Sequence, residues 1–105
     1  MPRIVVKGIE KESLKKISGE LFDVIAEIIN RPKEAFTLDL VESVAIESSK
    51  EIKRVHVEIG WKERPKEVCT SVANAVEKVF KKENYEHLII YFKNIDLENE
   101  YQFKK

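Results

Sequence analysis

A repeated order of alternating and helical patterns constrains this chain more than any other feature. An apolar run within residues 1–8 ends at Gly8, and the alternating run Val55–Ile59 ends at Gly60. Each run is followed by apolar residues spaced three and four apart, and then by another alternating run. The pattern predicts two successive strand-helix-strand units, in which equivalent positions such as Gly8 and Gly60 are 60 − 8 = 52 residues apart.

Under this offset, apolar positions of the first half fall on apolar positions of the second. The pairs are Ile17 with Cys69, Leu21 with Ala73, Val24 with Val76, Ile28 with Phe80, Leu38 with Ile90 and Leu40 with Phe92. The offset also pairs Val5 with Val57, although Ile4 and Val6 make the better inward pair. We therefore expect a one-residue irregularity in the first strand.

These patterns predict an α/β (α+β) domain built from duplicated β-α-β units. The units form a four-stranded mixed sheet with two helices on one face, plus short extra strands. We expect a single domain over residues 1–105, with repeat halves of about 1–50 and 51–105. The expected helices cover residues 11–30 and 65–83, and the expected strands cover 1–8, 35–41, 55–59 and 88–92. A hairpin or short edge strand is expected within 43–50, and a short C-terminal strand at 101–103.

The charge balance excludes several classes of partner. The chain has 19 basic and 19 acidic residues, so it lacks the excess charge of a nucleic-acid or anionic-membrane binder. No apolar run is long enough to span a membrane, and no signal peptide is visible. The single cysteine, Cys69, cannot form an internal disulfide, which favours a cytoplasmic location.

Few other residues suggest a catalytic or ligand-binding role. Cys69 falls on the apolar stripe of the second helix and is expected to be a buried small side chain. The two histidines, His56 and His87, do not form a zinc pattern, and we expect no metal and no cofactor. The cations Lys62, Arg64 and Lys66 near the second helix start could bind an anion, although a solvated charge run is the plainer interpretation. Trp61 is expected to be a packing or interface residue.

The second face of the sheet is expected to mix apolar and charged side chains. It would carry Val41, His56, Glu58, Ile89 and Tyr91 among others. Such a face is either open to solvent or packed against other copies of the chain.

Pro2 is the residue with the clearest chemical potential. Methionine is usually removed before a small second residue, and removal of Met1 would give Pro2 a free secondary amine. An apolar pocket would lower the pKa of that amine, because desolvation disfavours the charged form, and it could then act as a base near neutral pH. The alternative is a proline that merely begins a strand, or one whose nitrogen stays blocked by Met1.

Three stretches resemble the tautomerase superfamily, in its longer form typified by macrophage migration inhibitory factor. Residues 2–6 resemble the strand that begins with the family's catalytic proline, Arg31-Pro32 lies where the family has a lysine-proline pair, and Glu58-Ile59-Gly60 is similar to a Ser-Ile-Gly stretch. The two arginines of the 4-oxalocrotonate type fall at Glu12 and Thr37 here. The tyrosine and asparagine of the longer type's pocket fall at Ile89 and Tyr91.

The resemblance implies a homotrimer with sites at subunit boundaries, and a reaction that moves a proton between carbon and oxygen of a small keto/enol carboxylate. By residue match, Pro2 would be the catalytic base, Arg31 would hold the carboxylate, and the Ile59 backbone would line the pocket. Lys33 is a further candidate for placing the anionic end of the substrate. The alternative is a non-catalytic oligomeric binding or scaffold protein of the same fold.

Overall fold

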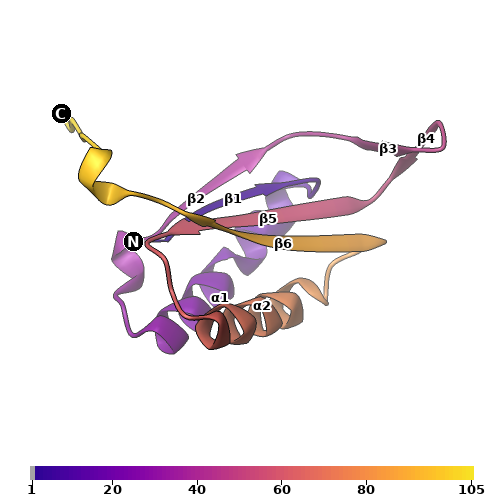
Figure 1. Cartoon of the computed structure of the whole chain (residues 1–105). Helices are drawn as coiled ribbons and strands as arrows, with labels where there is room; N and C mark the ends of the chain where they lie inside the picture. The colour runs from indigo at the N-terminus through magenta and orange to yellow at the C-terminus, as the bar shows by residue number, and fades with distance from the viewer. Residues whose placement is uncertain (1) are drawn as a thin grey trace.

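The computed structural model describes residues 2–105 and has two layers (Figure 1). A four-stranded sheet forms one layer, and two roughly side-by-side helices cover one of its faces. Met1, whose removal the proline chemistry requires, lies outside the described residues. The strands are β1 (Arg3–Lys7), β2 (Thr37–Val41), β3 (Ala45–Glu47), β4 (Lys50–Ile52), β5 (Arg54–Trp61) and β6 (His87–Asn94). The helices are α1 (Lys11–Ile29) and α2 (Lys66–Phe80), with 3₁₀ turns η1 (Lys33–Ala35) and η2 (Leu97–Asn99).

The main sheet has the strand order β2-β1-β5-β6. β1 pairs with β2 in parallel, β5 pairs with β6 in parallel, and the two inner strands β1 and β5 are antiparallel. Each parallel pair is joined by a helix, so each half is one β-α-β unit and the halves meet at β1 and β5. This arrangement confirms the predicted fold class.

Because side chains alternate along a strand, every second one points into a single hydrophobic core. Ile4 and Val6 of β1 face the helices, as do Val55, Val57 and Ile59 of β5. The helices contribute their apolar stripes because residues three and four apart share one face. The buried helix residues are Leu14, Ile17, Leu21, Ile25 and Ile29 of α1, and Val72, Val76, Val79 and Phe80 of α2.

The expected irregularity exists, but its predicted place within the first strand is wrong. Ile4 lies opposite Leu38, and Val57 lies opposite Ile90, so the inner strands differ by 57 − 4 = 53 residues whereas the outer strands differ by 90 − 38 = 52. The register of β1 is continuous with both neighbours from Arg3 to Lys7. The difference therefore lies between the paired strands, somewhere within residues 8–36 in one half and 62–86 in the other.

The short elements follow the prediction less closely. The expected hairpin is present as the antiparallel pair β3 and β4, which projects beyond the main sheet (Figure 1). The expected strand at 101–103 is wrong, because residues 101–105 have no regular secondary structure. A strand needs a neighbouring backbone to pair with, and Tyr101 and Phe103 instead lie 82% and 94% exposed. Within residues 2–105, neither helix combines the length and the apolarity needed to cross a bilayer.

The face of the sheet away from the helices is open. Val41 and Tyr91 on this face are 47% and 60% exposed, and Ile89 and His56 are half-buried. The open face forms a shallow concavity of about 400 Å³ between β2 and β6. It carries more apolar surface than alternation alone requires.

Candidate functional site

A cavity of about 340 Å³ lies at the end of the sheet where β1 begins and β5 ends. Four parts of the chain meet there: the residue before β1, the connection from α1 to β2, the connection from β5 to α2, and η2. Arg3, the first residue of β1, lies opposite Gly60, just before the chain leaves β5 for α2. The lining residues are Pro2, Arg31, Pro32, Ala35, Phe36, Lys62, Glu63, Arg64 and Leu97.

Pro2 is buried at this cavity, and the sheet fixes its position. Its carbonyl accepts a hydrogen bond from the Thr37 backbone N–H at 3.2 Å, which extends the parallel pairing of β1 and β2 by one residue. On the other side, the next residue, Arg3, lies opposite Gly60 of β5. The Pro2 ring is therefore held between the two neighbouring strands.

Arg31 reaches the cavity because α1 ends sharply before it. Asn30 adopts the left-handed conformation, with φ 54° and ψ 51°, and its backbone N–H bonds the carbonyl of Ala26. This is a common way to close a helix, since it satisfies a terminal carbonyl while reversing the chain direction. The side chain of Arg31 forms no ion pair with residues 2–105, so its guanidinium is available to a ligand.

Arg64 is the cavity residue that sequence reasoning misjudged. Its guanidinium lies over the indole ring of Trp61, 5.0 Å from the ring centroid, and its buried Nε has no hydrogen-bond partner among the described residues. Burial lowers the pKa of Arg64, and the charge of Arg31 lowers it further. The side chain is half-buried, so the predicted solvated charge run does not describe it. The signal in the sequence was the aromatic residue three positions earlier.

The structure brings Pro2 and Arg31 to one cavity, but it does not bring Lys33 or Ile59 into the lining. Lys33 Nζ lies 2.8 Å from Asp23 Oδ1 on the solvent side of α1, and this hydrogen bond raises the pKa of Lys33. Ile59 is fully buried in the core and lies opposite Ile4.

The cavity is suited to a small anion. Arg31, Arg64 and Lys62 contribute three cations to the lining, against one carboxylate from Glu63. Guanidinium groups bind carboxylates through two parallel N–H···O bonds, which fixes both position and orientation. Within residues 2–105 no cluster of three or more His, Cys, Asp or Glu side chains is arranged to hold a metal ion.

Comparison with known protein families identifies the family of this chain. Residues 1–104 match the family described as "Domain of unknown function (DUF1904)". The chain belongs to the DUF1904 family. A DUF1904 structure from Sebaldella termitidis ATCC 33386 is similar to it, with 28% sequence identity, a TM-score of 0.87, and coverage of 97% of this chain and 95% of that one.

More distant structures connect DUF1904 to tautomerase-like folds. The macrophage migration inhibitory factor-like protein of Entamoeba histolytica aligns with a TM-score of 0.77 and 18% identity, over 96% of this chain and 95% of that one. FG41 malonate semialdehyde decarboxylase aligns with a TM-score of 0.69 and 15% identity, over 100% and 91%. The resemblance to the tautomerase superfamily is thereby confirmed at the level of the fold. A search of curated proteins finds no match.

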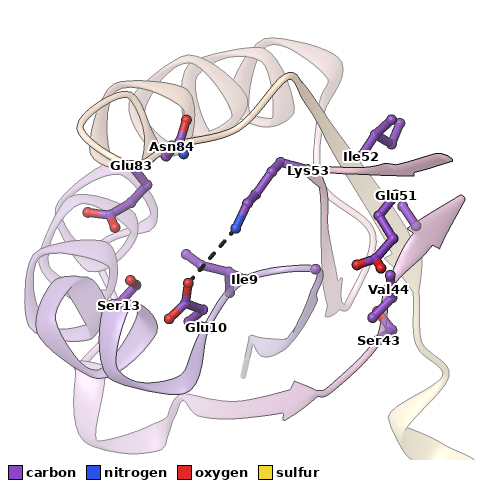
Figure 2. A pocket seen from close by; sticks show the side chains of 12 residues that line it. Ile9, Glu10, Ser13, Ser43, Val44, Glu51, Ile52, Lys53, Glu83 and Asn84 are labelled. Carbon is purple, nitrogen blue, oxygen red and sulfur yellow. Dashed lines mark ion pairs between the residues drawn. The ribbon is translucent and has the colours of Figure 1, made fainter. Parts of the chain in front are cut away.

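The DUF1904 chain has a second cavity at the opposite end of the sheet, shown in Figure 2. It measures about 290 Å³, and in it Lys53 Nζ lies 3.9 Å from Glu10 Oε1. The repeat offset of 52 residues relates the linings of the two cavities. Glu10 corresponds to Lys62 (62 − 10 = 52), and Arg31 corresponds to Glu83 (83 − 31 = 52). Two cations at the Pro2 end therefore correspond to acids at this end, so of these two cavities the Pro2 cavity is the better suited to an anion.

Proposed function

We propose that this protein is a proton-transfer enzyme of the tautomerase type that acts on a small keto/enol carboxylate. The observation that carries the proposal is the cavity that buried Pro2 shares with Arg31 and Arg64, neither of which pairs with an acid in residues 2–105. A base beside two anion-binding groups is what such a reaction needs.

Pro2 supplies the base once Met1 is removed. Its nitrogen then becomes a secondary amine, and two effects lower the pKa of that amine. Burial disfavours the charged form, and the nearby cations Arg31 and Arg64 repel a second positive charge. A neutral amine near pH 7 can accept a proton from carbon and return it to another atom.

Arg31 and Arg64 hold the carboxylate of the substrate. Both are placed by rigid parts of the fold, Arg31 by the end of α1 and Arg64 by its contact with Trp61. With the carboxylate fixed, the carbon next to the carbonyl group lies at the Pro2 amine. The amine takes the proton from this carbon, and the electron pair of the C–H bond forms the enol double bond. The protonated amine then gives this proton to the carbonyl oxygen, so the substrate keeps its composition and Pro2 returns to its neutral form.

We further propose that the protein assembles as a homotrimer in the cytoplasm. The open face of the sheet supports association, because Val41 and Tyr91 would otherwise expose apolar surface to water. The free thiol of Cys69 is in keeping with a reducing compartment. Analytical ultracentrifugation measures the number of chains, and a monomer at micromolar concentration would contradict the assembly.

Tautomerisation of phenylpyruvate and of 2-hydroxymuconate tests the reaction. Protein whose mass shows complete loss of Met1 is expected to accelerate one of them, and Pro2→Gly is expected to lose about two to four orders of magnitude in rate. Lys33→Ala is the matched control, since Lys33 lies outside the cavity. Equal rates for the wild type and Pro2→Gly would rule out the proline mechanism.

The second candidate is a carboxylate-binding protein without catalysis. The sequence has Met1 before Pro2, and a retained methionine turns the Pro2 nitrogen into an amide that cannot accept a proton. The arginines would still bind an anion. Protein purified from its native source with Met1 attached, binding pyruvate in calorimetry but inactive in both assays, would establish this candidate in place of the enzyme.

A further inference from the structure

Trp61 makes two ring contacts beside the Pro2 cavity. Its ring stacks on Phe92, with 5.1 Å between centroids and 18° between planes. The guanidinium of Arg64 also lies over the indole ring, 5.0 Å from its centroid. Trp61 is fully buried and ends β5, whereas Phe92 belongs to the neighbouring strand β6. The stack therefore rests on two paired strands of the sheet.

The indole face is what holds the Arg64 guanidinium. Among residues 2–105, the guanidinium takes part in no ion pair, and its buried Nε has no hydrogen-bond partner. The indole N–H of Trp61 is also buried and without a partner. Hydrogen bonding therefore does not explain a tryptophan at this position. The ring face does, because tryptophan attracts a cation more strongly than tyrosine or phenylalanine.

A planar guanidinium that is held over an aromatic ring can keep edge N–H groups free for a ligand. These edge donors are the groups that bind a carboxylate in a bidentate manner. Lysine has no such plane, so it could supply the charge at position 64 but not the orientation.

We propose that Trp61 is the positioning residue that orients Arg64 for the carboxylate of the substrate. The inference rests on the proposed function, because it assumes that the Pro2 cavity binds a carboxylate. It adds a specificity element that the sequence comparison with tautomerases did not assign. It also makes Trp61 a reporter of binding, since a carboxylate on Arg64 changes the charge that lies over the indole ring.

Intrinsic fluorescence tests this directly, because Trp61 is the only tryptophan in the chain. Pyruvate is the probe, and uncharged pyruvamide is its control. Pyruvate is expected to shift or quench the Trp61 emission of the full-length protein with the same Kd that calorimetry gives, whereas pyruvamide leaves the emission unchanged. Lys66→Gln, which removes a nearby charge outside the cavity, is expected to behave like the wild type.

Variants then separate orientation from charge. Trp61→Phe is expected to raise the calorimetric Kd for pyruvate between about threefold and thirtyfold. Arg64→Lys keeps the charge and the indole, and it is expected to raise the Kd by at least about tenfold because the planar guanidinium with its paired N–H donors is lost. If Trp61→Phe does not fold, as judged by circular dichroism, Arg64→Lys and the fluorescence titration decide.

The outcomes distinguish this inference from the function on which it rests. Pyruvate that binds in calorimetry without changing Trp61 emission would overturn the positioning role and leave the proposed function standing. An unchanged Kd in Arg64→Lys would do the same. Absence of pyruvate binding to the wild-type protein would overturn both.

Discussion

Glu100 forms an ion pair with Arg3, the residue that follows Pro2 in β1. This contact ties the C-terminal segment to the strand that presents Pro2. The segment is held at two further points, because the Ile95 N–H donates to the Trp61 carbonyl at 2.8 Å and Leu97 lines the cavity. One wall of the candidate site is thus built from residues that follow the last strand.

The first prediction concerns this ion pair and its dependence on pH. The hydrogen bond from Arg3 lowers the pKa of Glu100 below its ordinary value. A carboxylate with a lowered pKa in the folded state stabilises the protein above its unfolded pKa of about 4.3, and this contribution disappears as pH falls through the lowered folded pKa. Glu100→Gln is therefore expected to melt at a lower temperature than the wild type at pH 7 and at the same temperature near pH 2.

Thermal melts followed by circular dichroism from pH 7 to pH 2 measure this difference. Glu98→Gln is the control, because the exposed Glu98 side chain forms no ion pair with the described residues. A gap between Glu100→Gln and the wild type that stays constant across the pH range would contradict the prediction.

The second prediction separates Arg31 from Lys33, the two cations that the sequence offers for the substrate carboxylate. Arg31 lines the cavity, whereas Lys33 is paired with Asp23 on the surface. Arg31→Gln is expected to raise the Kd for pyruvate about tenfold to hundredfold, because a hydrogen bond to a charged group contributes about 1.5–3 kcal/mol. Lys33→Gln is expected to leave the Kd unchanged, and its effect on stability is expected to be small because the ion pair with Asp23 is exposed to solvent. Isothermal titration calorimetry distinguishes the two, and equal effects would mean that Lys33 also reaches the ligand.

The third prediction uses two glycines with opposite roles. Gly8 turns the chain from β1 to α1 with φ 92°, and a Cβ there would overlap the carbonyl oxygen of Arg54. Gly8→Ala is expected to lower the free energy of unfolding by at least about 1–3 kcal/mol, because the steric clash adds to the backbone strain. Gly19 lies within α1 with nothing near its missing Cβ, so Gly19→Ala is expected to gain about 0.5–1 kcal/mol. Urea denaturation measures both, and a loss in Gly19→Ala would contradict the assignment of an unhindered helical site.

The fourth prediction concerns His56 on the open face of the sheet. Burial lowers its pKa, and Lys7 of β1, Arg54 of β5 and His87 of β6 add to the effect. Because the folded pKa lies below the unfolded one, His56 favours folding above about pH 6.5, and this contribution is lost as pH falls through the folded pKa. Wild-type protein is expected to lose stability between pH 7 and pH 5 by more than His56→Gln does. Parallel slopes of melting temperature against pH would contradict this.

The sequence was sufficient for the topology because the two halves repeat one pattern. Alternating residues in the strands and apolar stripes in the helices depend on local periodicity, which a single sequence contains. Arg64 was harder to predict, because its burial depends on a stack that joins the ends of two strands. The failed strand at 101–103 has a related cause. Tyr101 and Phe103 have the composition of a strand, but strand formation depends on a partner that the sequence does not supply.

The relation between the two cavities has a practical consequence for solution spectroscopy. Since Lys62 and Arg31 at one end correspond to Glu10 and Glu83 at the other, the molecule contains its own reference. Changes of temperature, salt or buffer are expected to perturb amide resonances at both ends, whereas an added carboxylate is expected to perturb mainly those beside Pro2. Subtracting one set of chemical-shift changes from the other would isolate occupancy within a single sample.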